Sequence, residues 1–452
     1  MSRLFGTDGV RGIANQELTI ELVMRLGRVA GFLATKEGRG KVLVGRDTRL
    51  SGEMLAAALI AGITSSGADV YDLGVIPTPG VAYLCRSLEA DLGAVISASH
   101  NPFDDNGVKF FGSDGYKLTD VEEDRIASYI VDSKGSSIED TLPHPVAEKI
   151  GRVRKIDDAW QMYADFVKST ANFSLEGYKI ALDCANGAAY LAAPNVLESL
   201  GAEVILLNAD PNGKNINQSC GSTHPDQLKE AVIRSGAQVG IAHDGDADRV
   251  IFVDEKGEIV DGDHLMAIVA LDLMERNELP NKGIAATVYS NLGLKDVLSK
   301  NGGTVHITDN GDRYVLQEML KSGLILGGEQ SGHIIFLNYN STGDGLISAI
   351  RLLEVIVRKR KPLSELTAQM FTFPQLLVNV RVKDKILVME SELVKQAIKK
   401  ATEELGKEGR IFVRPSGTES LIRVMGEARD SGMVRKIVNE VAAAIASVDK
   451  DN

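Results

Sequence analysis

The chain has 452 residues and a formal net charge of −12, and 44% of its residues are hydrophobic. This length exceeds what one hydrophobic core normally serves, so we expect about three or four domains. The negative charge argues against nucleic acid or an anionic membrane as the main partner, whereas a small phosphorylated ligand needs only a few local cations. The composition predicts a globular multidomain protein with a small-molecule ligand.

The cysteines and the first residues indicate the compartment. Cys85, Cys184 and Cys220 form no CxxC pair, which is typical of reduced intracellular thiols. The opening MSRLFGTDGVRG has no apolar signal region, and the longest apolar runs are shorter than a membrane span. We therefore expect a cytoplasmic protein. For the same reason we assign no role to the three NxS/T triplets, which begin at Asn172, Asn217 and Asn340.

A strand, a helix and a second strand recur three times along the chain. The strand pairs are KVLVG with ADVYDLG, YKIALD with AEVILLN, and KGIAATV with GTVHIT. Each pair is followed by a further strand that ends in a polar loop, ISASHNP, HDGDADR or GGEQSGH. This order predicts α/β layered units, whose ligands gather beyond the carboxyl ends of the strands. We expect the three loops to occupy equivalent places in three similar domains.

The pattern changes after a basic segment that ends in Pro362. Strand LLVNVRV, helix SELVKQAIKKATEEL, two strands around RPSGTES and helix SGMVRKIVNEVAAAIASV predict a small α+β domain. The predicted fold class is therefore α/β: three similar α/β layered domains with mixed sheets and a smaller C-terminal α+β domain, around a central cleft. The predicted domains are residues 1–153, 154–254, 255–367 and 368–452.

Ser99 lies in the run AVISASHNPFDDNGVKFF, where an apolar strand ends in a hydroxyl, an imidazole and a turn. At the tip of a strand we expect this serine to be exposed and able to react. The alternative is a capping turn, since Ser and Asn side chains often bond to nearby backbone groups.

Three aspartates, Asp244, Asp246 and Asp248, alternate in VGIAHDGDADRVIFV. Their spacing resembles a calcium loop, but that loop needs glycine where Arg249 stands, and a strand follows instead of a helix. Clustered carboxylates repel one another unless a cation lies between them. The pattern predicts a site for one divalent ion with a phosphate oxygen as fourth ligand. Together with a nucleophilic serine, this site favours phosphoryl transfer.

Two further loops offer groups for anions and for sugar hydroxyls. RPSGTES lies between two strands, and its hydroxyls, backbone N–H groups and flanking arginines suit an anion. An ordinary polar hairpin is the alternative. GGEQSGH suits sugar hydroxyls, although each of its polar residues alone is as well explained as a surface group. The anion candidates are Arg414, Ser416, Gly417, Thr418 and Arg423, and the sugar candidates are Glu329, Ser331 and His333.

FGTDGVRG, SASHNP, DGDADR, GEQSGH and RPSGTE, in this order, resemble the α-D-phosphohexomutases over essentially the whole chain. Within that family the chain is most similar to the bacterial phosphoglucosamine mutases, through SRLFGTDGVRG, the double serine of ISASHNP, and Gln330. Ala247 in place of the usual glycine and Ser420 in place of proline depart from the pattern, and neither is a proposed ligand.

The resemblance implies a phosphoserine enzyme. Ser99 would carry a phosphoryl group, and one Mg²⁺ per subunit would be held by that group and by Asp244, Asp246 and Asp248. The phosphate would pass to O1 of glucosamine 6-phosphate, giving glucosamine 1,6-bisphosphate as the intermediate. Ser99 would then take back the O6 phosphate and leave glucosamine 1-phosphate, a precursor of UDP-N-acetylglucosamine.

The resemblance also implies roles for other residues. Lys109 resembles the acid/base residue of the family, with His333 and Arg11 assisting. Arg249 would steady the metal loop or the phosphoserine, and the RPSGTE residues would hold the phosphate that is not reacting. The implied sugar contacts are Glu329, Ser331, His333, Asp312 and Arg313.

Three other functions stay open at this point. A phosphoglucomutase or phosphomannomutase would keep the chemistry and change the sugar. A metal-dependent phosphatase would let water finish the reaction, and a non-catalytic sugar-phosphate sensor is disfavoured because every catalytic position is filled. The expected partner is a small phosphosugar, with no nucleic acid and no membrane, and a homodimer is a candidate for the oligomeric state.

Overall fold

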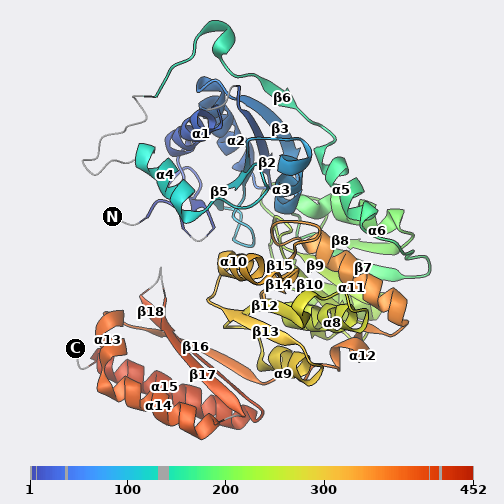
Figure 1. The fold of residues 1–452 in the computed structure, drawn as a ribbon, viewed down its shortest axis with the longest axis vertical. Coiled ribbons are helices and arrows are strands. Elements are labelled where there is room, and N and C mark those ends of the chain that lie inside the picture. Colours follow the sequence, from blue (N-terminus) through green and yellow to red (C-terminus); the bar gives the residue numbers. More distant parts are fainter. Residues whose placement is uncertain are drawn as a thin grey trace. The chain divides into compact units, whose positions relative to one another are not determined.

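A computed structural model describes residues 3–6, 8–35, 39–130, 142–406, 408–416 and 420–450 (Figure 1). The chain forms two compact units. The first combines Met1–Tyr289 with Gly302–Gln369, and the second combines Ser290–Asn301 with Met370–Asn452. In the described part of the chain, no helix has the length and apolar character needed to cross a membrane.

The first unit opens with a six-stranded mixed sheet in the order β1-β5-β4-β2-β3-β6. Strands β2, β3, β4 and β6 run parallel, and β5 and β1 are antiparallel to their neighbours. The strands are β1 (Val10–Ile13), β2 (Lys41–Arg46), β3 (Asp69–Val75), β4 (Leu92–Ile96), β5 (Asp105–Gly112) and β6 (Val153–Lys155). The helices are α1 (Ile20–Ala34), α2 (Gly52–Ser65), α3 (Thr78–Ser87) and α4 (Asp120–Ile130).

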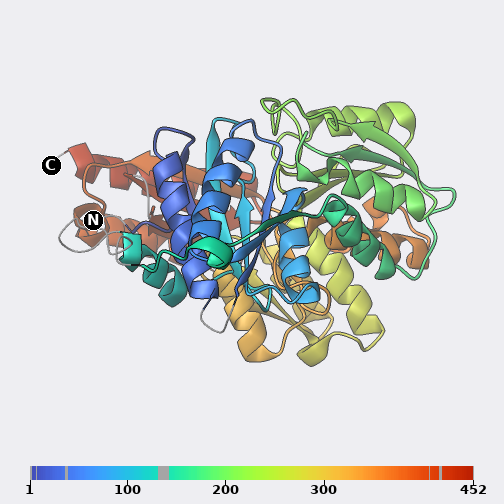
Figure 2. The ribbon, with the colours of Figure 1, turned by 90° about the horizontal axis from the view of Figure 1, so that it is seen from above.

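Side chains that alternate along β2 explain why helices cover both faces of this sheet. Val42 and Val44 pack into the apolar cluster formed with α1 and α2. A Cβ atom at Gly45 would meet Val81 of α3, on the opposite face. Figure 2 shows α1 and α2 side by side on one face of the sheet and α3 on the other. The result is the predicted α/β layered arrangement.

The same strand order recurs twice more in the first unit, as β8-β7-β9-β10-β11 and as β13-β12-β14-β15. In each sheet three parallel strands are followed by an antiparallel one. The strands are β7 (Lys179–Asp183), β8 (Glu203–Leu207), β9 (Val239–His243), β10 (Val250–Asp254), β11 (Ile259–Val260), β12 (Gly283–Thr287), β13 (Thr304–Thr308), β14 (Leu326–Gly328) and β15 (Ile334–Phe336). The helices are α5 (Ala159–Ser169), α6 (Ala192–Ser199), α7 (Asp226–Ser235), α8 (Gly262–Glu275), α10 (Asp312–Ser322), α11 (Gly345–Lys359) and α12 (Leu363–Thr367).

The three predicted loops occupy equivalent places in these sheets. ISASHNP joins β4 to β5, HDGDADR joins β9 to β10, and GGEQSGH joins β14 to β15. Each loop therefore follows the carboxyl end of a parallel strand and precedes the antiparallel one. The prediction of a threefold internal repeat is confirmed.

The second unit is a three-stranded antiparallel sheet in the order β16-β18-β17, packed against helices. Leu405 of α14 and Ile445 of α15 join Val424 of β18 in one apolar cluster. The strands are β16 (Gln375–Arg381), β17 (Gly409–Pro415) and β18 (Leu421–Ala428). The helices are α9 (Leu292–Lys300), α13 (Lys385–Glu390), α14 (Glu392–Leu405) and α15 (Ser431–Lys450). The predicted small α+β domain is confirmed, while the predicted boundaries between the domains stay predictions.

Candidate active site

Ser99 lies in the turn between β4 and β5 with a left-handed backbone, at a φ of 54°. Its hydroxyl donates a hydrogen bond of 2.6 Å to Oδ2 of Asp244 and lies 3.3 Å from Nδ1 of His100. Ser99 is only 1% exposed, so the expectation of an exposed serine is wrong. The turn is covered by loops that come from much later in the chain, which the local pattern of the strand cannot reveal.

A buried ion pair supports the serine turn. Nε of Arg49 lies 2.8 Å from Oδ2 of Asp47, and both side chains are fully buried. Arg49 also donates to the backbone carbonyls of Ser99, at 2.9 Å, and of Asn101, at 2.8 Å. Asp47 accepts a bond of 2.6 Å from the Ser97 hydroxyl, whose oxygen accepts the Ser99 N–H at 2.9 Å. The turn is thus fixed by buried, charge-assisted hydrogen bonds.

Sequence reasoning missed Asp47 and Arg49, although they follow β2 in the segment VGRDTR. The rule that singled out the other loops, polar groups after a buried parallel strand, applies here as well. Burial raises the pKa of Asp47, although Arg49 and Ser97 counteract the increase. Asp47 and Arg49 therefore support the turn that carries Ser99.

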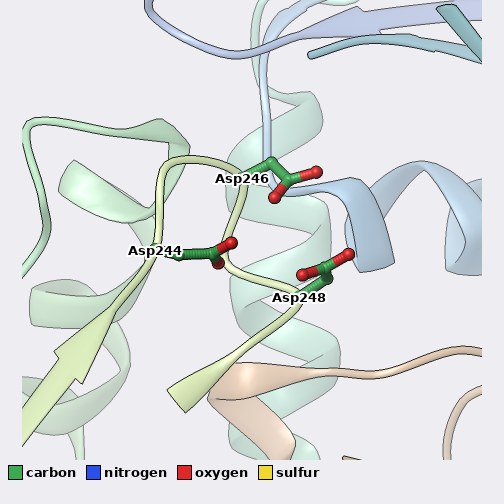
Figure 3. A group of neighbouring side chains, drawn as sticks. All are labelled: Asp244, Asp246 and Asp248. Atoms are coloured by element: carbon green, nitrogen blue, oxygen red, sulfur yellow. The ribbon is translucent and has the colours of Figure 1, made fainter. Parts of the chain in front are cut away.

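Asp244, Asp246 and Asp248 extend from the turn between β9 and β10 (Figure 3). One carboxylate oxygen from each lies within 4.8 Å of the others, and all three side chains are buried. In the described part of the chain, Oδ1 of Asp246 and Oδ1 of Asp248 have no hydrogen-bond partner. Buried carboxylate oxygens without partners are costly, and a hard divalent cation prefers such oxygens as ligands. The residues therefore fit a metal ion.

The pKa values of Asp244 and Asp248 are shifted in opposite directions. Burial, followed by repulsion from Asp248 and Asp246, raises the pKa of Asp244 to about 8. Burial also acts on Asp248, but Lys109, His333 and Arg249 outweigh it and hold the pKa of Asp248 far below its usual range. Without a cation, this cluster therefore keeps a proton on Asp244 at neutral pH.

Lys109 on β5 joins the aspartate cluster to the N-terminal segment. Its Nζ lies 3.0 Å from Oδ2 of Asp246 and 3.0 Å from Oδ2 of Asp8. Asp246 also accepts a bond of 2.6 Å from the hydroxyl of Thr78, at the start of α3. Burial lowers the pKa of Lys109, but Asp246, Asp8 and Asp248 outweigh it, so the pKa is raised. Lys109 is an ammonium group in this arrangement.

Lys117 and His333 extend this network of polar contacts to Asp312 and Asp248. Nζ of Lys117 lies 2.7 Å from Asp8 and 2.6 Å from Asp312. His333 stands between Asp312, at 3.5 Å, and Asp248, at 3.6 Å. Burial lowers the pKa of His333, but Asp248 and Asp312 outweigh it and raise the pKa overall. Asp8 and Lys117 were not predicted, although Asp8 lies in the same FGTDGVRG segment as Arg11.

The two predicted arginines lie beside these groups. Arg11 forms an ion pair with Asp8 and comes within 3.5 Å of the carbonyl of Ala98, directly before Ser99. Nε of Arg249 lies 3.9 Å from Oδ1 of Asp248. Burial of His100, with Arg249 and Arg11 nearby, lowers the pKa of that imidazole to about 4. His100 is therefore neutral at pH 7, next to the Ser99 hydroxyl.

The GGEQSGH loop is tied to the start of α8. Nε2 of Gln330 donates to Oδ2 of Asp261 at 3.1 Å, and Asp261 caps α8 by accepting the N–H of His264. The hydroxyl of Ser331 donates to Oε2 of Glu329 at 3.2 Å. The two predicted sugar contacts thus lie together, on a loop whose glutamine has an anchoring bond.

The structure separates the two predicted residues of NGDRYV. Asp312 belongs to the network around Asp8 and Asp248 through its contacts with Lys117 and His333. Arg313 instead lies 3.1 Å from Glu123 and forms an ion pair with Asp120, both on α4. Contact of Arg313 with a sugar stays a prediction that this arrangement does not support.

The anion candidates lie on the β17–β18 hairpin of the second unit. Arg414 and Arg423 are direct register partners on the two strands. This register brings two positive charges to one position on the hairpin, an arrangement that suits an anion. Ser416 is buried, and its carbonyl accepts a bond of 2.7 Å from Nζ of Lys385, which was not predicted. The candidates Gly417 and Thr418 lie outside the described residues.

Comparison with known families gives a match to each part of the chain. The matching descriptions all belong to phosphoglucomutase/phosphomannomutase. They are alpha/beta/alpha domain I over residues 2–135, domain II over 161–257, domain III over 261–373, and the C-terminal domain over 377–444.

Curated relatives match almost end to end. The phosphoglucosamine mutase of Carboxydothermus hydrogenoformans is 53% identical over 446 residues, which covers 98% of this chain and 99% of that protein. The phosphoglucosamine mutase of Moorella thermoacetica is 54% identical over 439 residues, which covers 97% and 98%.

Solved structures share the fold. A phosphoglucomutase/phosphomannomutase family protein of Burkholderia thailandensis has a TM-score of 0.81 at 24% identity and covers 99% of this chain and 98% of its own. Aspergillus fumigatus N-acetylphosphoglucosamine mutase, in complex with GlcNAc-6P and magnesium, has a TM-score of 0.68 at 17% identity and covers 98% and 96%. With all four domains matched in order and half of the residues identical to curated relatives, the chain belongs to the phosphoglucomutase/phosphomannomutase family.

Proposed function

We propose that the chain acts as a phosphoglucosamine mutase, interconverting glucosamine 6-phosphate and glucosamine 1-phosphate. The observation that carries the proposal is the Ser99 hydroxyl, which lies 2.6 Å from Asp244 in a buried cluster of three carboxylates. A nucleophilic oxygen beside a site for a hard cation is the arrangement that phosphoryl transfer needs. The choice of sugar is supported by curated relatives of that name at 53% and 54% identity.

In the proposed cycle, Oγ of Ser99 carries the phosphoryl group. The bond between phosphorus and Oγ breaks as O1 of glucosamine 6-phosphate bonds to phosphorus, which gives glucosamine 1,6-bisphosphate. After the bisphosphate has turned around, the bond between O6 and phosphorus breaks as Oγ takes the phosphoryl group back. Glucosamine 1-phosphate leaves, and one proton moves in each half, so the serine returns to its starting state.

The negatively charged residues would hold the metal, and a positively charged residue would transfer the proton. Asp244, Asp246 and Asp248, with a phosphate on Ser99, would hold one Mg²⁺, which supplies charge neutralisation to the phosphate when bound. Lys109 holds a proton in this arrangement, so it would donate that proton to Oγ as phosphorus leaves and take up the proton that the O1 hydroxyl loses. In the second half it would pass the proton that Oγ loses to O6 in the same way.

The remaining candidates would surround the phosphate and the sugar. Arg11, Arg249 and His333 would stabilise negative charge near the phosphoserine, and Glu329, Ser331 and Asp312 would contact sugar hydroxyls. Arg414, Ser416 and Arg423, together with Gly417 and Thr418, would hold the distant phosphate. A cleft between the domains, the homodimer and the cytoplasmic location stay predictions.

The test is the relative rate on four 6-phosphates: glucosamine, N-acetylglucosamine, glucose and mannose. We expect the highest kcat/KM on glucosamine 6-phosphate, together with an intact mass that shows a phosphoryl group on Ser99. Faster turnover of glucose or mannose 6-phosphate would make the chain a phosphoglucomutase or phosphomannomutase. Release of free phosphate at the rate of turnover would favour the phosphatase, and no turnover of any sugar would leave only the sensor.

A further inference from the structure

Asn217 connects the serine turn to a loop that lies far away in the sequence. It follows β8, is 8% exposed, and has a left-handed backbone at a φ of 57°. Its Nδ2 atom donates to the carbonyl of Ser99 at 2.9 Å and to the carbonyl of Asn101 at 3.1 Å. Because both partners are acceptors, the two amide hydrogens are the only side-chain atoms of Asn217 that suit them.

The same two carbonyls also accept hydrogen bonds from Arg49, at 2.9 Å and 2.8 Å. A carbonyl oxygen has two lone pairs, so the carbonyls of Ser99 and Asn101 are each fully used. Arg49 follows β2, which belongs to the same sheet as β4 and β5 on either side of the serine turn, whereas Asn217 follows β8, which belongs to the sheet that carries the aspartate loop. The hydrogen bonds of Asn217 therefore connect the serine turn to the second sheet, which the hydrogen bonds of Arg49 do not.

The aspartate loop packs against the same two groups, the Ser99 carbonyl and the Asn217 amide. A Cβ atom at Gly245 would lie 2.5 Å from the Ser99 carbonyl oxygen and 2.8 Å from Nδ2 of Asn217. Gly245 stands between Asp244 and Asp246, so the serine backbone, the amide and the aspartate loop are in direct contact. The Asn217 amide thus lies where the serine turn and the aspartate loop meet.

We propose that Asn217 is a positioning residue for phosphoryl transfer, holding Ser99 against the aspartate loop through the carbonyls of Ser99 and Asn101. The inference rests on the proposed function, because a serine that gives and takes back a phosphoryl group must meet phosphorus at the same place twice. A displacement of about 1 Å costs about a hundredfold in rate. Asn217 bonds to the backbone of the serine turn, so we expect the loss to appear mainly in kcat and little in KM.

The test compares Asn217→Ala and the isosteric Asn217→Asp with Asn215→Ala. Asn215 lies in the same loop and makes two hydrogen bonds of its own, with Asn212 and Asp210, but none to the serine turn. Each protein is mixed with glucosamine 1,6-bisphosphate and Mg²⁺, and phosphorylation of Ser99 is followed by intact mass. Steady-state kinetics and a thermal melt accompany the time course, and rates are expressed per folded protein.

We expect both Asn217 variants to phosphorylate Ser99 about a hundredfold more slowly, with KM within about threefold of wild type. Asn215→Ala should match wild type in both. Normal phosphorylation in Asn217→Asp, or a rise in KM as large as the fall in kcat, would overturn the positioning role while leaving the proposed function intact. If wild type itself gained no phosphoryl group on Ser99, the proposed function would fail, and this inference with it.

Discussion

Two regions of this chain are predicted to meet phosphate, and they hold their charges in opposite ways. Around Ser99, positive and negative groups alternate at short range, with Lys109 3.0 Å from both Asp246 and Asp8. On the C-terminal hairpin, Arg414 and Arg423 face each other in the strand register. The first region surrounds the serine with groups of both signs, whereas the second brings two arginines to one register position on neighbouring strands.

This difference separates chemistry from binding. Groups that are already oriented need little reorganisation when charge develops during phosphoryl transfer, which is the largest source of catalysis in many enzymes. Two neighbouring arginines can both bond to one anion, in the ground state and in the transition state alike. Substitutions in the first region should therefore lower kcat, and substitutions in the second should mainly raise KM.

The largest effect is expected from Ser99→Ala, which removes the proposed carrier. We expect no detectable mutase turnover and no phosphorylated protein by intact mass, with a melting temperature close to wild type because one hydroxyl is lost. Ser97→Ala is the control, since it keeps the carrier and removes the supporting hydrogen bonds to the Ser99 N–H and to Asp47. It should retain measurable turnover and a phosphorylated Ser99. Near wild-type turnover by Ser99→Ala would show that Ser99 does not carry the phosphoryl group.

Asp246→Asn should follow, with a loss of about a hundredfold or more in kcat. The change removes charge at Oδ1, which has no hydrogen-bond partner in the described part of the chain, and weakens the pair with Lys109. Calorimetry with Mg²⁺ should show weaker binding. Asp254→Asn makes the same substitution at the far end of β10, where Oδ1 accepts two backbone N–H groups. Undiminished Mg²⁺ affinity in Asp246→Asn would argue against the metal site.

The sequence predicts the fold well because each sheet repeats one local pattern. Buried strands and amphipathic helices alternate in the same order three times, so parallel strands and their carboxyl-end loops follow from periodicity alone. The aspartates of HDGDADR were predicted for the same reason, since they are contiguous and follow a strand. The three loops that carry chemistry thus needed no tertiary information.

The groups that fix these loops were not predicted, because their partners are distant in sequence. The sequence predicts no role for Asn217, which begins an NxS triplet, yet its buried amide donates a hydrogen bond to the carbonyl of Ser99. Lys117 forms ion pairs with Asp8 and Asp312, which lie in other segments of the chain, so its place in the site could not be predicted from its own segment. Burial of Ser99 depends on the same long-range packing. Periodicity predicts where a loop begins, but not which loop covers it.

Arg423→Ala tests the binding region. Each charge-assisted hydrogen bond that is lost costs about 1.5 to 3 kcal/mol, so KM for the sugar phosphate should rise about ten- to hundredfold. The fall in kcat should be smaller, and more of the 1,6-bisphosphate should escape before it has turned around. Steady-state kinetics with and without added bisphosphate, together with detection of released bisphosphate, measure both effects. An unchanged KM with no extra release would make RPSGTES an ordinary polar hairpin.

The smallest expected effect is the pH dependence of Mg²⁺ binding to the aspartate cluster. Burial and the neighbouring carboxylates raise the pKa of Asp244 to about 8, so at pH 7 the metal-free cluster holds a proton that Mg²⁺ must displace. As pH rises toward 8, the displaced proton costs less, and Mg²⁺ affinity should increase about tenfold per pH unit before levelling off.

Calorimetry in buffers with different ionisation enthalpies measures the number of protons released, which we expect to be close to one at pH 7 and to fall above pH 8. The raised pKa also means that the metal-free protein loses stability as pH rises from about 4 to about 8, because the folded state prefers the protonated carboxyl. Mg²⁺ should remove that loss. Asp244→Asn would abolish the pH dependence of binding, whereas Arg423→Ala, in the other region, should leave it unchanged. A proton release near zero in wild type at pH 7 would mean that the cluster is already fully charged without metal.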